Sequence, residues 1–179
     1  MRAPFQILAI PYRKREKYQF CVFHRADIDQ YQFVAGGGED DEDAYEAAVR
    51  EIREETKVSA GALVPLTSMA FIPAAVISEK HRRFWSEDTY VIPEYAFGFE
   101  CDTDICLSDE HADYEWLDYK EARSRLTWDS NKTALYELNC RLQKEKRITL
   151  CKSNNVSEYV SCIDQSGMYD LSGRKVYPS

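Results

Sequence analysis

The sequence predicts an α/β protein in which helices cover both faces of a mixed β-sheet. Short β-prone runs recur along the chain, and helical segments lie between and after them. The helical segments carry apolar stripes, which need an apolar surface to pack on, and a sheet covered on both faces provides it. The chain has 179 residues, enough for one domain with a substantial core.

The predicted strands are short and separated by turns. Phe5–Pro11 and Phe20–His24 flank a charged turn at residues 13–17, which is typical of a hairpin. The next expected strand is Tyr31–Val34, and the glycine triplet at 36–38 is expected to break it. Further β-prone runs cover residues 62–66, 68–77, 90–100 and 114–117.

The strongest helix prediction begins after Asp43. Asp43 is a good N-cap, and Glu46 three residues later completes a capping-box pattern. Helical spacing predicts one buried stripe: Tyr45, Ala48, Val49 and Ile52. Two later segments, 119–126 and 130–144, are also expected to be helical, with Asp129 or Ser130 capping the second. After about Lys146 the content of Ser, Asn and Gly rises, which indicates an appended hairpin or arm over residues 147–179.

Composition narrows the function classes. The net charge of −8 argues against broad binding to a nucleic acid polymer, although an acidic protein can hold small phosphate compounds through metal ions. No apolar run approaches the ~20 residues of a membrane-spanning helix, and the first residues are too weakly apolar for a signal peptide. We therefore expect a cytoplasmic protein without membrane contact.

The six cysteines are scattered and show no zinc-binding spacing. With three histidines in the chain, a structural zinc site is not expected. We interpret the cysteines as reduced and mostly buried thiols, with a Cys151–Cys162 disulfide left open as an alternative.

Glu51, Glu54 and Glu55 stand at i, i+3 and i+4, so their carboxylates share one side of the predicted helix. Such like charges repel unless a cation joins them, and hard oxygen ligands suit Mg²⁺ or Mn²⁺. Arg50 lies one turn before Glu54 and can hold a carboxylate through a bidentate contact. A solvated charged face is the alternative interpretation of such a run.

The whole segment 36–58 resembles the Nudix signature, a spacing too long and specific to be read as a solvated face. The positions in register are Gly36, Glu42, Arg50, Glu51, Ile52, Glu54, Glu55 and Val58. Lys57 stands where the family usually has a glycine, so we expect a slightly different helix exit. A P-loop is excluded because no Gly-Lys-Ser/Thr follows the glycines and acidic residues crowd the segment.

Three stretches outside the signature are similar to one Nudix branch, the bacterial dATP (dihydroneopterin triphosphate) pyrophosphohydrolases. They are residues 23–27, 108–118 and 126–132, and the resemblance spans about residues 4–145. It implies a Nudix α/β/α sandwich, with a mixed sheet between helices, over residues 1–146. The implied activity is Mg²⁺-dependent cleavage of a nucleoside-triphosphate-like substrate to a monophosphate and pyrophosphate.

The resemblance also implies roles for particular residues. Glu51, Glu54 and Glu55 would bind the metal together with the carbonyl of Ala35, and Arg50 would orient them. Glu110 would complete the metal site or serve as the catalytic base, with an ordinary exposed loop acid as the alternative. The cofactor would be Mg²⁺, or Mn²⁺.

Substrate contacts are harder to assign from sequence. Arg25 could contact phosphate, as could the basic run Lys80, His81, Arg82 and Arg83, whose alternative is a solvated loop. Trp85, Tyr90, Trp116 and Trp128 could stack on a base or pterin, although we expect most of them in the core. Alternative functions are hydrolysis of another X-linked diphosphate (ADP-ribose, a nucleotide sugar or a dinucleoside polyphosphate) and a non-catalytic Nudix-fold binding module. A homodimer is compatible with the sequence.

Overall fold

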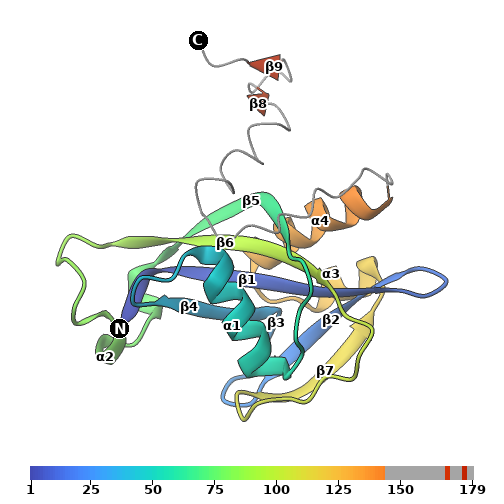
Figure 1. Cartoon of the computed structure of the whole chain (residues 1–179), viewed down its shortest axis with the longest axis horizontal. Coiled ribbons are helices and arrows are strands. Elements are labelled where there is room, and N and C mark those ends of the chain that lie inside the picture. Colours follow the sequence, from blue (N-terminus) through green and yellow to red (C-terminus); the bar gives the residue numbers. More distant parts are fainter. Residues whose placement is uncertain (144–167, 170–174, 177–179) are drawn as a thin grey trace.

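A mixed β-sheet lies between α1 on one face and α3 and α4 on the other, which confirms the predicted fold class (Figure 1). The computed structural model describes residues 1–143, 168–169 and 175–176. The strands of the sheet are β1 (Arg2–Lys14), β2 (Tyr18–Arg25), β3 (Tyr31–Gln32), β4 (Val34–Glu39), β5 (Val64–Pro73), β6 (Val91–Glu100) and β7 (His111–Leu117). The helices are α1 (Ala44–Thr56), α2 (Glu79–Arg82), α3 (Tyr119–Arg125), α4 (Asp129–Gln143) and the 3₁₀ turn η1 (Ala74–Val76).

Strand β1 organises the sheet. Its N-terminal half pairs antiparallel with β4, and its C-terminal end pairs antiparallel with β2. On its other side β1 pairs parallel with β6, and β5 extends the sheet antiparallel to β6. Strand β7 pairs with β2. This arrangement brings the glycine-containing strand β4 and the loop before β7 to the side of the sheet that α1 covers.

Alternation along β1 produces the two core layers. Ile7 and Ala9 face α1, where they pack with Ile52. Leu8 and Ile10 face α4, where they pack with Leu135 and Leu138. Because side chains of a strand point alternately to its two faces, a long apolar run such as 7–10 is typical of a strand buried on both sides.

Two strand predictions were wrong in detail. The glycines do not break a strand: β4 runs through Gly36–Gly38 and pairs with β1. The runs 62–66 and 68–77 are one strand, β5, whose register shifts between Pro65 and Met69 in a bulge. Local propensity could not predict either result, because both depend on pairing with strands distant in sequence.

Helix α1 begins as predicted. The Asp43 side chain accepts hydrogen bonds from the backbone of Tyr45 and Glu46, and the Glu46 side chain completes the capping box. The predicted stripe was shifted, since Val49 is exposed while Ala44 and Ala47 are buried.

The predicted change at the helix exit was wrong. Lys57 adopts the left-handed backbone conformation, with φ 59° and ψ 11°, and its N–H donates to the Arg53 carbonyl. A lysine therefore occupies the conformation that glycine favours.

The remaining sequence predictions concern the cysteines, the C-terminal segment and membrane contact. Cys21, Cys101, Cys106 and Cys140 are free, but only the first two are buried. Cys151, Cys162 and the boundary at Lys146 lie outside the described residues, and of the C-terminal segment the structure describes β8 (Met168–Tyr169) paired antiparallel with β9 (Lys175–Val176). In the part of the chain that the structure describes, no helix is long and apolar enough to cross a membrane.

Candidate functional site

Arg50 is the centre of a charged network between α1 and β4. Its guanidinium donates two hydrogen bonds to the Glu42 carboxylate, from Nε at 2.8 Å and from Nη2 at 2.9 Å. Nη1 donates to Glu51 at 2.9 Å and to Glu54 at 3.3 Å, and Nη2 also donates to the Gly37 carbonyl at 2.7 Å. The bidentate partner of Arg50 is therefore Glu42 rather than Glu54. Through the Gly37 carbonyl, the guanidinium also connects α1 to β4.

Glu51 lies against the backbone of β4. A Cβ added to Gly36 would come within 2.0 Å of its carboxyl carbon, so glycine leaves room for the carboxylate in this position. Burial raises the pKa of Glu51, and the charge of Glu54 adds to the rise, while the Arg50 contact lowers it. The close approach of the Glu51 carboxylate to the backbone therefore explains why the signature has a glycine at position 36.

Glu55 is buried, unlike Glu54 on the same helix. It is 4% exposed, and its Oε2 lies 2.7 Å from Nε2 of His111, the first residue of β7. Burial raises the pKa of Glu55 to about 7, although the hydrogen bond and charge of His111 lower it. His111 was not among the predicted site residues, and its position directly after Glu110 was the available signal.

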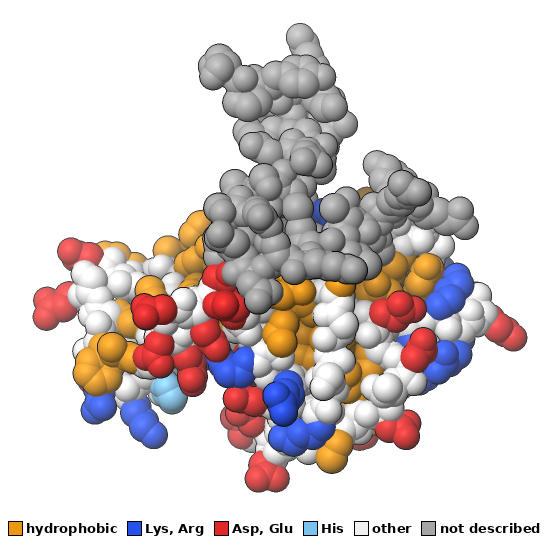
Figure 2. Space-filling model, viewed as in Figure 1, with side chains coloured by type: hydrophobic (Ala, Val, Ile, Leu, Met, Phe, Trp, Pro, Cys, Tyr) orange, Lys and Arg blue, Asp and Glu red, His pale blue; other side chains and the backbone are white. Residues whose placement is uncertain are grey.

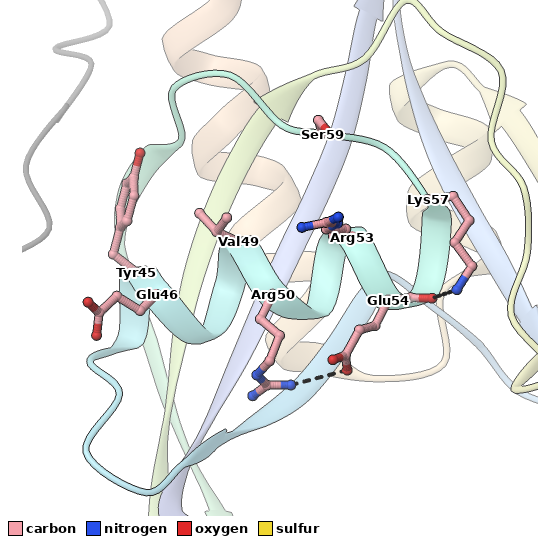
Figure 3. A pocket seen from close by; sticks show the side chains of 8 residues that line it. All are labelled: Tyr45, Glu46, Val49, Arg50, Arg53, Glu54, Lys57 and Ser59. Carbon is pink, nitrogen blue, oxygen red and sulfur yellow. Dashed lines mark hydrogen bonds and ion pairs between the residues drawn. The ribbon is translucent and has the colours of Figure 1, made fainter.

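Glu54 is the accessible member of the three. Its side chain is 60% exposed and lines a hollow of about 770 Å³ on the outer side of α1, together with Arg50, Arg53 and Lys57. Figure 3 shows the side chains of Arg50 and Glu54 turned toward each other, and that of Lys57 reaching back to the Glu54 backbone carbonyl. Acidic side chains gather on this face of the molecule, with basic ones among them (Figure 2).

Glu110 and Arg25 lie close to the glutamates. Glu110 is exposed in the turn before β7, and its charge raises the pKa of Glu55. Arg25 at the end of β2 forms two 2.7 Å hydrogen bonds with Asp27. The hydrogen bonds that Arg25 donates to Asp27 raise the pKa of Arg25, as do the charges of Glu110 and Glu55. The strand pair β2–β7 therefore brings Glu110 and Arg25 to the buried end of the glutamate set.

The donor chemistry of the glutamates fits a divalent cation. Glu55 is buried and Glu51 is partly buried beside the exposed Glu54, and burial raises the pKa of Glu51 and of Glu55, a cost that a bound cation would offset. The glutamates are not arranged as a complete set of metal ligands. Within the described residues, no three acidic, histidine or cysteine side chains lie close enough together to bind one metal ion. Instead Nη1 of Arg50 lies between Glu51 and Glu54, and His111 holds Glu55.

Of the other predicted residues, one lies near the glutamates and two lie away from them. Ala35, in β4, directly precedes Gly36 and so lies next to the Glu51 contact. Arg82 and Arg83 are exposed at the end of α2, which Figure 1 places beside the N-terminus and away from β7. No contact joins either arginine to the glutamates among the described residues, so the structure does not bring the basic run to the predicted metal site.

Arg2 is a second residue that sequence analysis missed. Its guanidinium lies over Gly37, where an added Cβ would be 1.6 Å from Cζ. Burial lowers the pKa of Arg2, while the charge of Glu51 raises it. In the described structure its Nε is buried and has no hydrogen-bond partner.

The aromatic candidates are less buried than expected. Tyr90 is 74% exposed and Trp128 45% exposed, whereas Trp116 is partly covered by the Arg13 guanidinium. The indole of Trp85 donates to the Arg2 carbonyl at 2.8 Å. Trp128 lines a pocket on the α4 face.

Comparisons with known proteins show which family the chain resembles. Residues 5–138 match the NUDIX domain family. A protein of Listeria monocytogenes assigned as a NUDIX hydrolase is 46% identical, with a TM-score of 0.69 over 80% of this chain and 97% of that chain. The dihydroneopterin triphosphate pyrophosphohydrolase of E. coli is 25% identical, with a TM-score of 0.62 over 77% and 97% of the two chains.

A third solved structure shares the fold alone. The Ap4A hydrolase of C. elegans is 17% identical, with a TM-score of 0.59 over 79% of this chain and 99% of that chain. No curated protein matches the sequence.

Proposed function

The chain belongs to the NUDIX domain family, and from this premise we propose that it is a divalent-cation-dependent pyrophosphohydrolase that converts a nucleoside-triphosphate-like substrate to a monophosphate and pyrophosphate. A NUDIX pyrophosphohydrolase is what the family match and the hydrolase neighbours support. The triphosphate preference rests on the likeness to the E. coli enzyme. The observation that carries the proposal is the Arg50 network, which positions Glu51 and Glu54 at the glycine strand.

Glu51, Glu54, Glu55 and the Ala35 carbonyl would hold Mg²⁺ or Mn²⁺. When bound, the cation supplies neutralising charge to the phosphate chain and makes water easier to deprotonate. Arg50 orients Glu51 and Glu54, and its grip on Glu42 and the Gly37 carbonyl keeps that orientation rigid. His111 fixes Glu55 in the same way from the other side.

We assign the base to Glu110. It is exposed to water, and within the described residues no hydrogen bond or ion pair holds its carboxylate, so it is free to take a proton. Arg25 is the nearby cation for the substrate's phosphates, since its charge interacts with both Glu110 and Glu55. Arg82 and Arg83 are proposed only as outer contacts for a long substrate.

A substrate panel with Mg²⁺ tests this function. The panel holds dATP, dihydroneopterin triphosphate, ADP-ribose and Ap4A, and pyrophosphate and phosphate are both quantified. We expect pyrophosphate from the triphosphates at one equivalent per monophosphate. Turnover of ADP-ribose or Ap4A without turnover of the triphosphates would assign the enzyme to another diphosphate class, and no turnover of any compound would indicate a binding module.

A further inference from the structure

Strand β5 forms one edge of the sheet, and within the described residues no strand pairs with its outer side (Figure 1). Its ten residues, Val64–Pro73, include no charged side chain. An uncharged edge strand accepts a further strand easily, so natural proteins usually charge such an edge, interrupt it with proline or cover it. The prolines at positions 65 and 73 interrupt only the two ends of β5. The middle of the strand therefore needs a cover.

The backbone of Met69 and Phe71 faces the outer side of β5. Phe71 lies opposite Pro93 of β6, which has no N–H, so the hydrogen-bonded pairs of this ladder are formed by the neighbouring Ala70 and Ile72. The N–H and carbonyl groups of Met69 and Phe71 consequently point away from β6. Two residues, separated by one, thus present their backbone hydrogen-bonding groups at the edge.

The same part of the edge carries an apolar strip. Met69 lies opposite Tyr95, which packs against the α1 layer of the core, so the side chains of Met69, Phe71 and Val91 point to the α1 face of the sheet. They are 54%, 64% and 53% exposed, respectively. Helix α1 packs mainly on β4 and β1, so the strip lies beside the helix rather than beneath it. We call these three residues the edge strip.

The edge strip is complementary to a second copy of itself. In an antiparallel pairing, with the two-fold axis between the two Ala70 residues, Met69 of one copy lies opposite Phe71 of the other. Both cross-strand pairs of this kind are hydrogen-bonded pairs, so every outward backbone group of Met69 and Phe71 finds a partner. The thioether of Met69 also meets the ring of Phe71, which is a favourable contact.

Charge and area determine how strong this contact is. Each copy has a net charge of −8, but β5 and the edge strip hold no charged residue, so the pairing opposes no like charges. A partner of another sequence has to provide a matching strand, whereas a second copy provides it by symmetry. The three side chains expose roughly 100 Å² each, which is well below the ~800 Å² per partner of a standard interface. The contact is therefore weak and forms at high protein concentration.

We propose that β5 pairs with β5 of a second copy in this two-fold register, so that the sheets of two molecules join at their edges. The pairing buries the edge strip of both copies and closes the uncharged edge against other strands. The inference does not depend on the proposed hydrolase function, because neither the contact nor its test involves a substrate.

Sedimentation velocity of the full chain measures the dimer. We expect mostly monomer at about 5 µM and mostly dimer at about 500 µM, which corresponds to a Kd on the order of 100 µM. Phe71→Glu should raise this Kd at least about tenfold, because its charge enters the apolar contact. The matched control is Val76→Glu, which adds the same charge at a residue that is 61% exposed in η1 and lies outside the edge strip. The control should leave the Kd unchanged.

A pair of opposite charges tests the register. Because residue 69 of one copy lies opposite residue 71 of the other, the double variant Met69→Lys/Phe71→Glu places opposite charges together in both cross-strand pairs. This double variant should dimerise at least about fivefold more tightly than Met69→Lys or Phe71→Glu alone. A double variant as weak as the single variants would overturn the proposed pairing.

Hydrogen exchange, read at single residues by mass spectrometry with electron-transfer fragmentation, reports on the backbone of the edge. The amides of Met69 and Phe71 should exchange about threefold more slowly at about 500 µM than at about 5 µM. The amide of Ala70, which is bonded to β6, should show no such difference. Slow exchange of Met69 and Phe71 at both concentrations would show that another part of the same chain covers the edge. Slow exchange of that kind, a monomer at about 500 µM, or a dimer insensitive to Phe71→Glu would each overturn the proposal.

Discussion

At the scale of single residues, the site depends on which side chains are fixed and which are free. Glu51 and Glu55 are each held by a partner and are partly and fully buried, respectively, whereas Glu54 and Glu110 are exposed. The spacing within the signature predicted that the three glutamates act together, because residues three and four apart share a helix face. It could not identify His111, because that contact depends on where β7 pairs with β2.

Lys57→Gly tests the helix exit. The left-handed backbone of Lys57 disfavours a side chain, so glycine should raise the free energy of unfolding by several tenths to ~1 kcal/mol. The loss of the exposed Nζ contact with the Glu54 carbonyl reduces this gain only slightly. Urea unfolding at neutral pH measures the change, and Lys57→Ala separates the side-chain contact from the backbone effect. A clear loss of stability in Lys57→Gly would mean that the helix continues through this residue.

At the scale of elements, α4 stabilises the bulge in β5. The Glu137 carboxylate accepts from the backbone N–H of Thr67 at 2.7 Å and of Ser68 at 2.6 Å, and it also pairs with Arg141. These are the groups that the bulge leaves without a strand partner. The amphipathic face of α4 was predictable from sequence, but this cap was not, because the bulge itself arises from pairing with β6.

Glu137→Gln should lower the free energy of unfolding at pH 7 by about 1–2 kcal/mol, because charge-assisted hydrogen bonds to the bulge are lost. Burial alone would raise the pKa of Glu137, but hydrogen bonds from Ser68 and Thr67 and the charge of Arg141 bring it below its ordinary value of 4.5. A lowered pKa stabilises the fold above the unfolded value and loses that effect as the pH falls through the folded value.

The difference between the wild-type protein and Glu137→Gln should therefore shrink as the pH falls below about 4.5. Chemical unfolding at pH 7 and at pH 3.5 measures it. A difference that stays constant between these two values would show that the carboxylate charge does not stabilise the bulge.

At the scale of the whole molecule, the sheet carries groups from distant segments to one region. The fold class was predictable because the apolar stripes of the helices require a sheet covered on both faces, and α1 and α4 provide that cover. The open edge at β5 was not predictable, because it depends on the order of the strands in the sheet. Arg2 reaches Gly37 through the pairing of β1 with β4, which has the same kind of origin.

Cation binding should stabilise the folded protein as a whole. Mg²⁺ at ten times its dissociation constant should add roughly 1.4 kcal/mol and raise Tm by about 3–6 °C, because it binds the folded state. Glu54→Gln should show a smaller shift in the same thermal scan. The matched control is Glu46→Gln, on the same helix and beside the same hollow, where glutamine preserves the capping box. Equal shifts in the two variants would remove Glu54 from the ligand set.

The measurement that tests the central claim most directly is pyrophosphate release from dGTP and dATP by the wild-type protein, Glu54→Gln and Glu46→Gln, with Mg²⁺ and with excess EDTA. We predict Mg²⁺-dependent pyrophosphate release by the wild type and by Glu46→Gln. In Glu54→Gln, kcat/KM should fall by about 100-fold or more. Circular dichroism should show that the Glu54→Gln variant keeps its fold. Full activity of Glu54→Gln, or release that persists in EDTA, would contradict the assignment of the Arg50 network as the active site.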